Sequence, residues 1–325
     1  MQTVSAQLIA GKKVLLRLDI DVPIENGKIL ETFRLESGLE TLKLCLAHAE
    51  SVTCMGHIGR PGGVEVPELS VGPVVAWYEE QLKDLQLPEG KFHFLENLRF
   101  EKGEDEASVE YAHELAKMGD FFVLEAFASH RPAASTTVLA SLLPHAAGLR
   151  FAKEVAELTK VRENPHRPMV AIIGGAKIED KLAVVEQMSK SADAVLIGGK
   201  LPHEIKEKGL TFAPNVLVAR MNESGFDLET EVAEKFADII KAAKQIVWAG
   251  PMGKYEDEDQ REGTRILAQA AVDSGLYSVI GGGDTITALS GVHMLDKMSF
   301  VSTGGGAMLK MLADGTLPTI EALKN

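Results

Sequence analysis

The sequence predicts an α/β protein with two domains, each built around a doubly wound parallel sheet. Its 325 residues are enough for two domains with separate cores. Short apolar runs alternate with segments of helical periodicity, and this alternation is typical of parallel βαβ units. A helical segment at residues 151–162 is interrupted by residues 163–168 (ENPHRP), which places the boundary between the domains near mid-chain.

In the first half of the chain, each predicted strand ends in a loop that carries ionisable side chains. Strands are expected at residues 14–19, 52–55, 92–95 and 121–124, and a helix with Arg34 in its first turn at residues 32–50. Ligands of an open α/β sheet bind beyond the carboxyl ends of its strands. Arginine and histidine hold phosphate and carboxylate groups with directed hydrogen bonds, so this half is predicted to bind a small anion. The side chains at these strand ends are Asp19, His57, Arg60, Arg99 and Arg131.

In the second half, the predicted strands end in glycine instead of charge. The strands are expected at residues 169–173, 194–197, 245–248, 277–280 and 300–302, and glycines follow each of them. Glycine turns at helix starts let the backbone approach a polyphosphate closely, which favours a nucleotide site. Asp284 follows three of these glycines and is a candidate ligand for a magnesium ion carried by the nucleotide phosphates.

Residues 169–181 (MVAIIGGAKIEDK) show this pattern most clearly. An apolar run ends on Gly174 and Gly175, and the pattern then changes to helical spacing. Lys177 and Lys181 are four residues apart, which puts both ammonium groups on one face of a helix. A strand, a glycine turn and a helix start with lysines together predict a site for a phosphate-bearing ligand.

Each of these signals also has a plainer interpretation. Paired glycines after strands often only form tight turns, and Lys177 with Lys181 is equally typical of a solvated helix face. His57 fits a structural histidine as well as a ligand, and each arginine could pair with one of the many carboxylates. The plainer interpretations are weakened because all these residues occupy the same place, the carboxyl end of a strand.

Composition and motifs exclude several other classes of protein. The formal net charge of −13 argues against general nucleic-acid binding, which depends on neutralising phosphates with Lys and Arg. No signal-peptide pattern or membrane-spanning run is present, so a cytoplasmic protein without a membrane partner is expected. Cys45 and Cys54 lie in apolar surroundings without metal-ligand spacing and are expected to be buried thiols. The P-loop, dinucleotide, zinc-protease and serine-hydrolase patterns are absent.

Seven short motifs, in a fixed order along nearly the whole chain, resemble phosphoglycerate kinase. Any one of them would be weak, but seven in order are highly specific. They are residues 14–23 (VLLRLDIDVP), 57–61 (HIGRP), 95–100 (LENLRF), 174–181 (GGAKIEDK), 250–253 (GPMG), 281–284 (GGGD) and 302–307 (STGGGA).

The resemblance implies two Rossmann-like domains joined by a hinge helix. The expected parts are a phosphoglycerate-binding domain at residues 1–150, a hinge helix and linker at 151–168, and a nucleotide-binding domain at 169–310. A C-terminal segment at 311–325 is expected to pack back on the first domain. The implied reaction is reversible phosphoryl transfer between 1,3-bisphosphoglycerate and ADP–Mg²⁺, a step of glycolysis, by in-line transfer with domain closure.

The resemblance also implies a role for each matching residue. The phosphoglycerate-binding positions are Asp19, Asp21, Arg34, His57, Arg60, Arg99 and Arg131. The positions that act on the transferring phosphoryl group are Arg34, Lys177, Gly283 and Gly305. The nucleotide-binding positions are Gly175, Ala176, Lys177, Lys181, Gly198, Gly199, Gly253, Glu256, Gly282, Gly283, Asp284 and Thr285. Asp284 is also the expected magnesium ligand.

The chain departs from the family pattern at some of these places. Asp21 stands where the family has asparagine, and this adds a carboxylate beside an anionic substrate unless it turns away or finds a partner. Ala249 replaces another asparagine, and Lys200 replaces a small residue. The chain is shortened between residues 208 and 226, where the family builds much of its nucleoside pocket.

Two alternative functions stay open on the sequence. Asp21 and the short arginine loop around Arg131 also fit a kinase for a related small acid. Ala249 and the shortened nucleoside segment also fit a catalytically silent binding protein with the same fold. The expected partners are small molecules, ADP or ATP and phosphoglycerate, and the family suggests a monomer.

Overall fold

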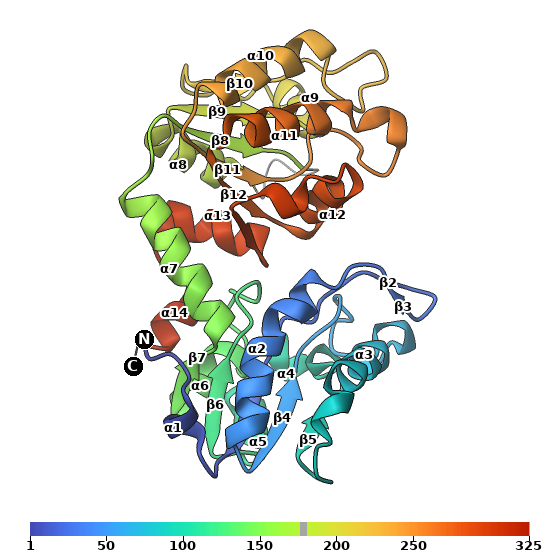
Figure 1. The fold of residues 1–325 in the computed structure, drawn as a ribbon, viewed down its shortest axis with the longest axis vertical. Coiled ribbons are helices and arrows are strands. Elements are labelled where there is room, and N and C mark those ends of the chain that lie inside the picture. The colour runs from blue at the N-terminus through green and yellow to red at the C-terminus, as the bar shows by residue number, and fades with distance from the viewer. Residues whose placement is uncertain (176–180, 325) are drawn as a thin grey trace. The chain divides into compact units, whose positions relative to one another are not determined.

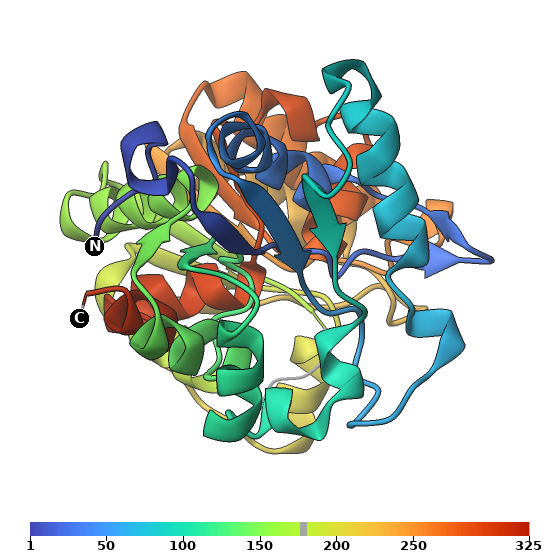
Figure 2. The ribbon, with the colours of Figure 1, turned by 90° about the horizontal axis from the view of Figure 1, so that it is seen from below.

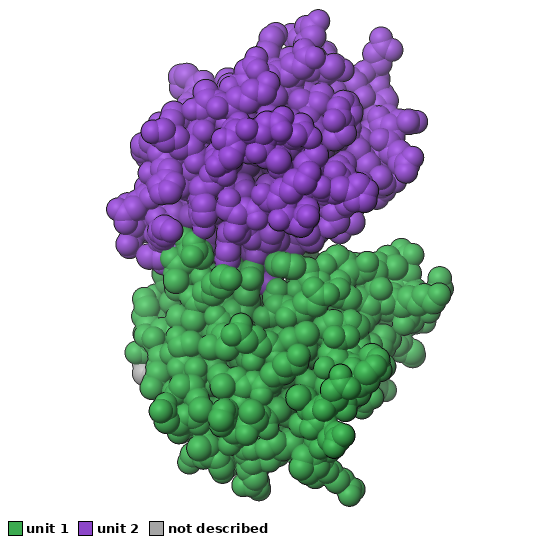
Figure 3. All heavy atoms as spheres, viewed as in Figure 1, with its two compact units in different colours: residues 1–157, 316–325 green, residues 158–315 purple. Residues whose placement is uncertain are grey.

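The computed structural model describes residues 1–175 and 181–324, which form two compact units (Figure 3). Unit 1 runs from Met1 to Glu157 and includes the C-terminal segment that begins at Thr316. Unit 2 runs from Leu158 to Gly315. Among the described residues, no helix has both the length and the apolar composition of a transmembrane span.

Unit 1 contains a five-stranded parallel sheet in the order β5-β4-β1-β6-β7 (Figure 1). Numbered along the chain, this order is 3-2-1-4-5, the strand order of a Rossmann fold, whose ligand crevice opens between the first and fourth strands. That switch point lies between β1 and β6. The strands are β1 (Lys13–Arg17), β4 (Ser51–Met55), β5 (Phe92–Phe94), β6 (Phe121–Leu124) and β7 (His145–Ala147).

Helices cover both faces of the unit 1 sheet, so its central strands are buried apolar runs. Figure 2 shows α2 on one side of the strands and α5 and α6 on the other. Cys45 on α2 and Cys54 on β4 are buried in the same core, as the sequence predicted. The helices are α1 (Ala6–Ile9), α2 (Phe33–His48), α3 (Gly72–Leu82), α4 (Lys102–Asp105), α5 (Val109–Ala116), α6 (Leu139–Leu142) and α14 (Pro318–Ala322). Shorter turns are η1 (Pro67–Leu69), η2 (Lys83–Leu85), η3 (Leu98–Phe100) and the π-helical η4 (Ala134–Val138), which contacts α14.

Unit 2 contains a six-stranded parallel sheet in the order β10-β9-β8-β11-β12-β13. The order along the chain is 3-2-1-4-5-6, again the Rossmann order, and the switch point lies between β8 and β11. The strands are β8 (Met169–Ile173), β9 (Ala194–Ile197), β10 (Val216–Val218), β11 (Gln245–Ala249), β12 (Tyr277–Gly281) and β13 (Phe300–Ser302). The predicted doubly wound fold is therefore confirmed.

The helices of unit 2 pack on this sheet around a core that includes Trp248 and Phe236. Helices α10 and α11 lie against each other, and α13 contacts α8. The helices are α8 (Leu182–Ser191), α9 (Leu201–Glu207), α10 (Thr230–Lys241), α11 (Glu262–Ser274), α12 (Gly283–Gly291) and α13 (Gly305–Asp314), with the short turns η5 (Glu258–Gln260) and η6 (Leu295–Lys297).

Four short strands were not anticipated from the sequence. Strands β7 and β10 have three residues each and lie at the edges of the two sheets. Strands β2 (Ile24–Glu25) and β3 (Lys28–Ile29) form a small antiparallel hairpin. Runs of two or three residues are too short to show a hydrophobic period, so only pairing with a neighbouring strand defines them.

Helix α7 (Leu149–Glu163) contains the division between the units, which falls after Glu157. Its first turn is bound by Glu125, which follows β6: one carboxylate oxygen accepts a hydrogen bond from the Arg150 N–H (3.1 Å) and the other from the Phe151 N–H (3.0 Å). These N–H groups have no partner within the helix, so the two side-chain oxygens of Glu125 satisfy them.

Candidate active site

Asp19 lies at the switch point of the unit 1 sheet, two residues beyond the end of β1, and binds the loop after β6. Its side chain is buried, and Oδ2 accepts a hydrogen bond from the Ala128 N–H (2.7 Å) while Oδ1 accepts one from the Ser129 hydroxyl (2.9 Å). Burial raises the pKa of Asp19, and the charge of Arg34 is the largest opposing effect. The carboxylate thus ties the loop after β1 to the loop after β6.

Asp21 is turned toward the loop that follows β4. Its Oδ1 accepts a hydrogen bond from the Gly59 N–H (2.9 Å), and its backbone carbonyl accepts one from the Arg34 guanidinium. The Asp21 carboxylate would repel an anionic substrate if it were unpaired. The hydrogen bond from the Gly59 N–H compensates part of its negative charge. Asp21 also fixes Arg34 beside the site through the carbonyl.

His57, at the end of β4, is 8% exposed and contacts a buried arginine. The Nη2 of Arg17 lies 2.6 Å from Nδ1 of the imidazole. Burial lowers the pKa of His57 well below its usual value, and the nearby arginine charges lower it further. The imidazole is therefore neutral at physiological pH.

The predicted cations divide into two groups in the structure. The charges of Arg34, Arg60 and Arg99 all act on His57, so these four residues form one cluster. Arg131 lies on the exposed loop after β6, and its charge is not among the principal ones acting on His57. Within the described part of the chain, the side chains of Arg60 and Arg131 form no hydrogen bond or ion pair, so both are available to an anion.

Arg99 is held more firmly than the sequence suggested. Its Nε donates to Asp105 (2.8 Å) and its Nη1 donates to the Gly59 carbonyl (2.8 Å). The plainer interpretation, pairing with a carboxylate, thus applies to this arginine in part. Because Asp105 is half exposed, the pair is weak enough for an anionic ligand to compete with it.

Sequence reasoning missed the buried residues beneath this cluster. Arg17, Glu104 and Ser135 are all 1% exposed or less and are linked to one another by hydrogen bonds or charge. The signal was present, because Arg17 interrupts an otherwise apolar buried strand. A charge in such a strand is costly unless it has partners, so its presence already implied them.

Backbone packs directly on backbone at the switch point of unit 2. A Cβ added to Gly250 would lie 2.2 Å from the carbonyl carbon of Gly174, and Gly250 has a φ of +97°. A Cβ on Gly199 would similarly meet the Gly175 nitrogen at 2.8 Å. These glycines are therefore required by the packing of the loops, which is the plainer of the two interpretations the sequence allowed.

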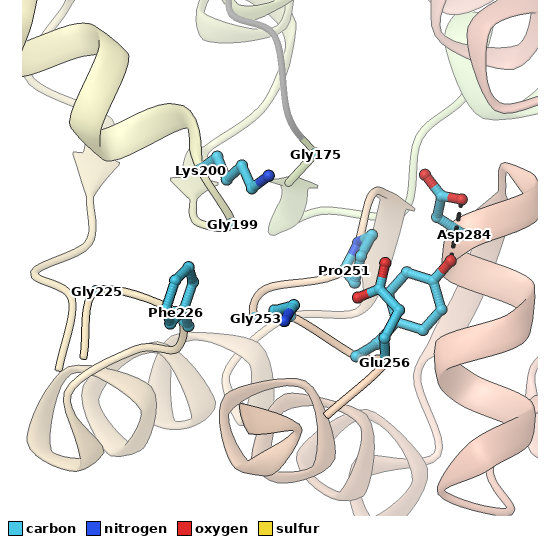
Figure 4. Close-up of a pocket in the computed structure, with 11 residues that line it drawn as sticks. Gly175, Gly199, Lys200, Gly225, Phe226, Pro251, Gly253, Glu256 and Asp284 are labelled. Carbon is cyan, nitrogen blue, oxygen red and sulfur yellow. Dashed lines mark hydrogen bonds between the residues drawn. The ribbon is translucent and has the colours of Figure 1, made fainter. Parts of the chain in front are cut away.

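A pocket opens beside these glycine loops (Figure 4). The side chain of Phe226 lies on one side of it, and Asp284 and Glu256 lie on the other. Lys200, next to Gly199, extends toward Gly175. The lining residues are Gly175, Gly199, Lys200, Gly225, Phe226, Pro251, Gly253, Lys254, Tyr255, Glu256 and Asp284.

An exposed aromatic ring and a lysine on the pocket wall were not predicted. Phe226 is 47% exposed, and the Nζ of Lys254 lies 5.4 Å from the centre of its ring. Lys254 also pairs with Asp257 at 2.7 Å. Phe226 follows a polar Asn-Glu-Ser-Gly loop, and an isolated aromatic residue in such a loop is the signal that could have identified it.

The N-termini of α12 and α13 offer backbone N–H groups. A Cβ on Gly305 would lie 2.6 Å from the Cα of Gly282, so the two helix starts approach closely. Among the described residues, no neighbouring side chain or loop lies within 4 Å of a Cβ added to Gly283, which leaves an open cradle at that helix start. The Thr285 hydroxyl is used within the protein, accepting from the Gly250 N–H (2.7 Å) and donating to the Gly281 carbonyl (2.9 Å).

The remaining predicted nucleotide residues differ in their surroundings. Gly198 is covered by Met252, whose Cε would lie 2.5 Å from an added Cβ, so it does not line the pocket. Lys181 lies near the glycine turn, with its Cε 3.9 Å from a Cβ built on Gly175. Ala176 and Lys177 lie outside the described residues.

Asp284 fits a magnesium ion that arrives with nucleotide phosphates. Its exposed carboxylate stands in the first turn of α12 and accepts a hydrogen bond from the Tyr255 hydroxyl (3.3 Å) through one oxygen. Burial raises the pKa of Tyr255 to about 12, so this hydroxyl keeps its proton. The described residues contain no cluster of three or more potential metal ligands, and a single carboxylate suits magnesium that keeps its phosphate and water ligands.

The fold defines a two-unit α/β protein with a Rossmann-type parallel sheet in each unit, charged side chains at the strand ends of unit 1 and glycine turns at those of unit 2. The sequence matches the family model described as phosphoglycerate kinase over residues 4–210 and 204–315. The chain therefore belongs to the phosphoglycerate kinase family, as its motifs predicted, and is a kinase.

Two solved structures support this assignment. The phosphoglycerate kinase from Coxiella burnetii is 31% identical, with a TM-score of 0.78, and the alignment covers 97% of each chain. The phosphoglycerate kinase from Pyrococcus horikoshii OT3 is 27% identical, with a TM-score of 0.84, and the alignment covers 97% of this chain and 96% of that one. Both share the fold over nearly the full length.

Proposed function

We propose that the protein transfers a phosphoryl group reversibly between 1,3-bisphosphoglycerate and ADP–Mg²⁺, giving 3-phosphoglycerate and ATP. The observation that carries this proposal is the cluster of Arg34, Arg60 and Arg99 around a neutral His57 at the strand ends of unit 1. Such a cluster suits a ligand with both a carboxylate and a phosphate. Membership of the phosphoglycerate kinase family supports the choice of this reaction.

In this proposal, residues 1–150 bind phosphoglycerate and residues 169–310 bind the nucleotide. The pocket beside the glycine loops takes the nucleotide, with Glu256 and Phe226 toward the nucleoside and Asp284 toward the phosphates. Magnesium bound with the nucleotide would supply positive charge to the phosphate oxygens, and Asp284 would hold it. Closure of the domains during transfer, a cytoplasmic location and a monomeric state belong to the same proposal and come from the family.

The proposed chemistry needs charge and alignment, and no general base. The acceptor carboxylate of 3-phosphoglycerate is already ionised at neutral pH. The protein must then neutralise charge on the transferring group and hold the reactants in line. Arg34, Lys177 and the N–H groups at Gly283 and Gly305 are the residues proposed for this role.

Neither alternative function gains support from a specific observation. Asp21 has a backbone donor for its carboxylate, so the extra charge gives no reason to change the substrate. The pocket beside Gly253 is open despite the shortened segment, so the chain has room for part of a nucleotide.

A coupled assay with 3-phosphoglycerate and ATP–Mg²⁺ tests the proposal, and parallel assays with related phospho-acids test its specificity. We expect turnover with a clear preference for 3-phosphoglycerate, and a large loss of rate in Lys177→Ala. Lys190→Ala, a substitution in the last turn of α8, is the control and should retain activity. Absence of turnover together with nucleotide binding would favour the silent binding protein, and a preference for another acid would favour the related kinase.

A further inference from the structure

Arg17 is a fully buried charge that the proposed mechanism does not use. It is the last residue of β1 and is 1% exposed. A buried arginine in a parallel strand is costly unless it is hydrogen-bonded and its charge is compensated. Its three nitrogen atoms do find partners: Nε donates to the Ser135 hydroxyl (2.9 Å), Nη1 to the Leu18 carbonyl, and Nη2 points at Nδ1 of His57 (2.6 Å).

The arginine is held in place from behind by a carboxylate. Glu104 is also 1% exposed and lies 4.0 Å from Nη2 of Arg17. Its two oxygens accept hydrogen bonds from the Ser135 hydroxyl (2.6 Å) and the Ser135 N–H (3.0 Å). Arg17 is thus clamped between Ser135 and Glu104 with one donor directed at His57.

This contact fixes which nitrogen of His57 carries the proton. A guanidinium has only donors and cannot accept a hydrogen bond. Nδ1 of His57 must therefore accept, and the single proton of the neutral imidazole must be on Nε2. An ordinary histidine exchanges between two tautomers, whereas His57 is restricted to one.

The charges around His57 also favour its neutral form. Four arginines lower its pKa in addition to burial, with Arg17 the largest of them, and protonation would also break the bond at Nδ1. The carboxylates of this region are engaged elsewhere: Glu104 with Ser135, and Asp19 and Asp21 with backbone or hydroxyl donors. The other three arginines that act on His57 are Arg99, Arg34 and Arg60.

We propose that Arg17 is a positioning residue that holds His57 as a neutral Nε2–H donor, so that the site offers phosphoglycerate one fixed hydrogen bond across a wide pH range. The role of His57 toward phosphoglycerate rests on the proposed function, whereas the tautomer rests on the geometry of Arg17 alone. Arg17 itself, being buried, acts on the ligand through His57.

Nitrogen-detected NMR of imidazole-labelled protein tests the tautomer without any substrate. The His57 signal is identified by its loss in His57→Gln. Because loss of Arg17 alone would leave Glu104 unpaired, the test variant is the double substitution Arg17→Met/Glu104→Gln, and Glu104→Gln alone is the matched control. Met approximates the length of the stem and cannot donate to Nδ1.

We expect His57 to remain a single Nε2–H tautomer between about pH 5.5 and 8 in the wild type and in Glu104→Gln. In the double variant, we expect both tautomers and a titration within that range. A wild-type His57 that titrates there, or a tautomer unchanged by the loss of Arg17, would overturn the proposal.

Binding of 3-phosphoglycerate by calorimetry at the two ends of this pH range tests the consequence. In the double variant, binding should become about tenfold tighter at the lower pH relative to Glu104→Gln, because a charged donor is stronger than a neutral one. Adding His57→Gln to both proteins should abolish this difference. Because the two proteins are compared at the same pH, the titration of the ligand phosphate affects both equally and cancels. If the tautomer behaves as expected and the wild type does not bind 3-phosphoglycerate, the proposed function fails and the assignment to Arg17 stands. If the wild type binds and the pH difference is absent, the role of His57 is refuted.

Discussion

The two units share the Rossmann strand order but build their switch points from different material. In unit 1, polar side chains meet beyond the end of β1: Asp19 binds the loop after β6, and Arg17 binds His57, which follows β4. In unit 2, backbone meets backbone between β8 and β11, with Gly250 against Gly174. The first arrangement is sensitive to charge and the second to a single added methyl group. The strand order determines where the ligand crevice lies in each unit. The residue types at the strand ends determine which substitutions destabilise it.

Gly250→Ala should give the largest effect of any single change considered. Its methyl group would lie 2.2 Å from a backbone atom of Gly174, which cannot rotate away, and its φ of +97° is unfavourable for alanine. We expect the free energy of unfolding of unit 2 to fall by about 3–5 kcal/mol in urea denaturation. Gly209→Ala is the control: Gly209 has a φ of +62°, and no described residue lies within 4 Å of an added Cβ, so the change should cost only about 1 kcal/mol. If both substitutions lowered the free energy of unfolding equally, close backbone packing at Gly250 would not be what stabilises the switch point of unit 2.

Arg34→Gln tests the charged switch point of unit 1. If Arg34 stabilises the transferring phosphoryl group, kcat should fall about 100-fold, or about 2.7 kcal/mol, in the coupled assay. The affinity for nucleotide should change little. Arg220→Gln, which removes an exposed arginine paired with Glu229, is the control and should retain full activity. An equal loss in nucleotide affinity and in kcat would contradict the separation of roles between the units.

Glu125 makes the stability of unit 1 depend on pH. Burial raises its pKa from 4.5 to about 8, against the opposing effect of hydrogen bonds from Phe151, Thr41 and Arg150. Between these two pKa values the folded state keeps a proton that the unfolded state has released. Stability therefore falls as pH rises through this window, by about 2 kcal/mol from about pH 5.5 to 7.

Urea denaturation across this pH range measures the effect. Glu125→Gln should flatten the slope, whatever its effect on absolute stability. Glu110→Gln, in the first turn of α5, is an exposed control that should leave the slope unchanged. A wild-type slope of zero or of the opposite sign would show that Glu125 is ionised in the folded protein.

Phe226→Ala should give the smallest effect, and it tests whether this ring contacts the nucleoside in the pocket of unit 2. Loss of the exposed ring removes apolar contact area from one wall, so KM for ATP should rise about threefold, with kcat nearly unchanged. Val218→Ala, an exposed apolar residue on β10, is the control. An unchanged KM would place the nucleoside away from this wall.

Much of the fold was accessible from the sequence because its signals are local. The apolar runs that became β6 and β8 are continuous, as expected for strands buried on both faces, and those of β1 and β4 are predominantly apolar. The charged and glycine-rich ends of these strands were also visible, because they are part of the same short segments. The edge strands β7 and β10 were missed because three residues carry no period of their own.

By itself, the sequence determined the fold class, the family and the kind of chemistry at each strand end. Tertiary structure alone decided which partner each group takes: Gly59 for Asp21, Arg17 for His57, and Gly174 for Gly250. The physical reason is distance along the chain, since Arg17 and His57 are 40 positions apart and meet only when β1 pairs with β4. A residue's type sets which interactions it can make, and folding sets which of them it does make.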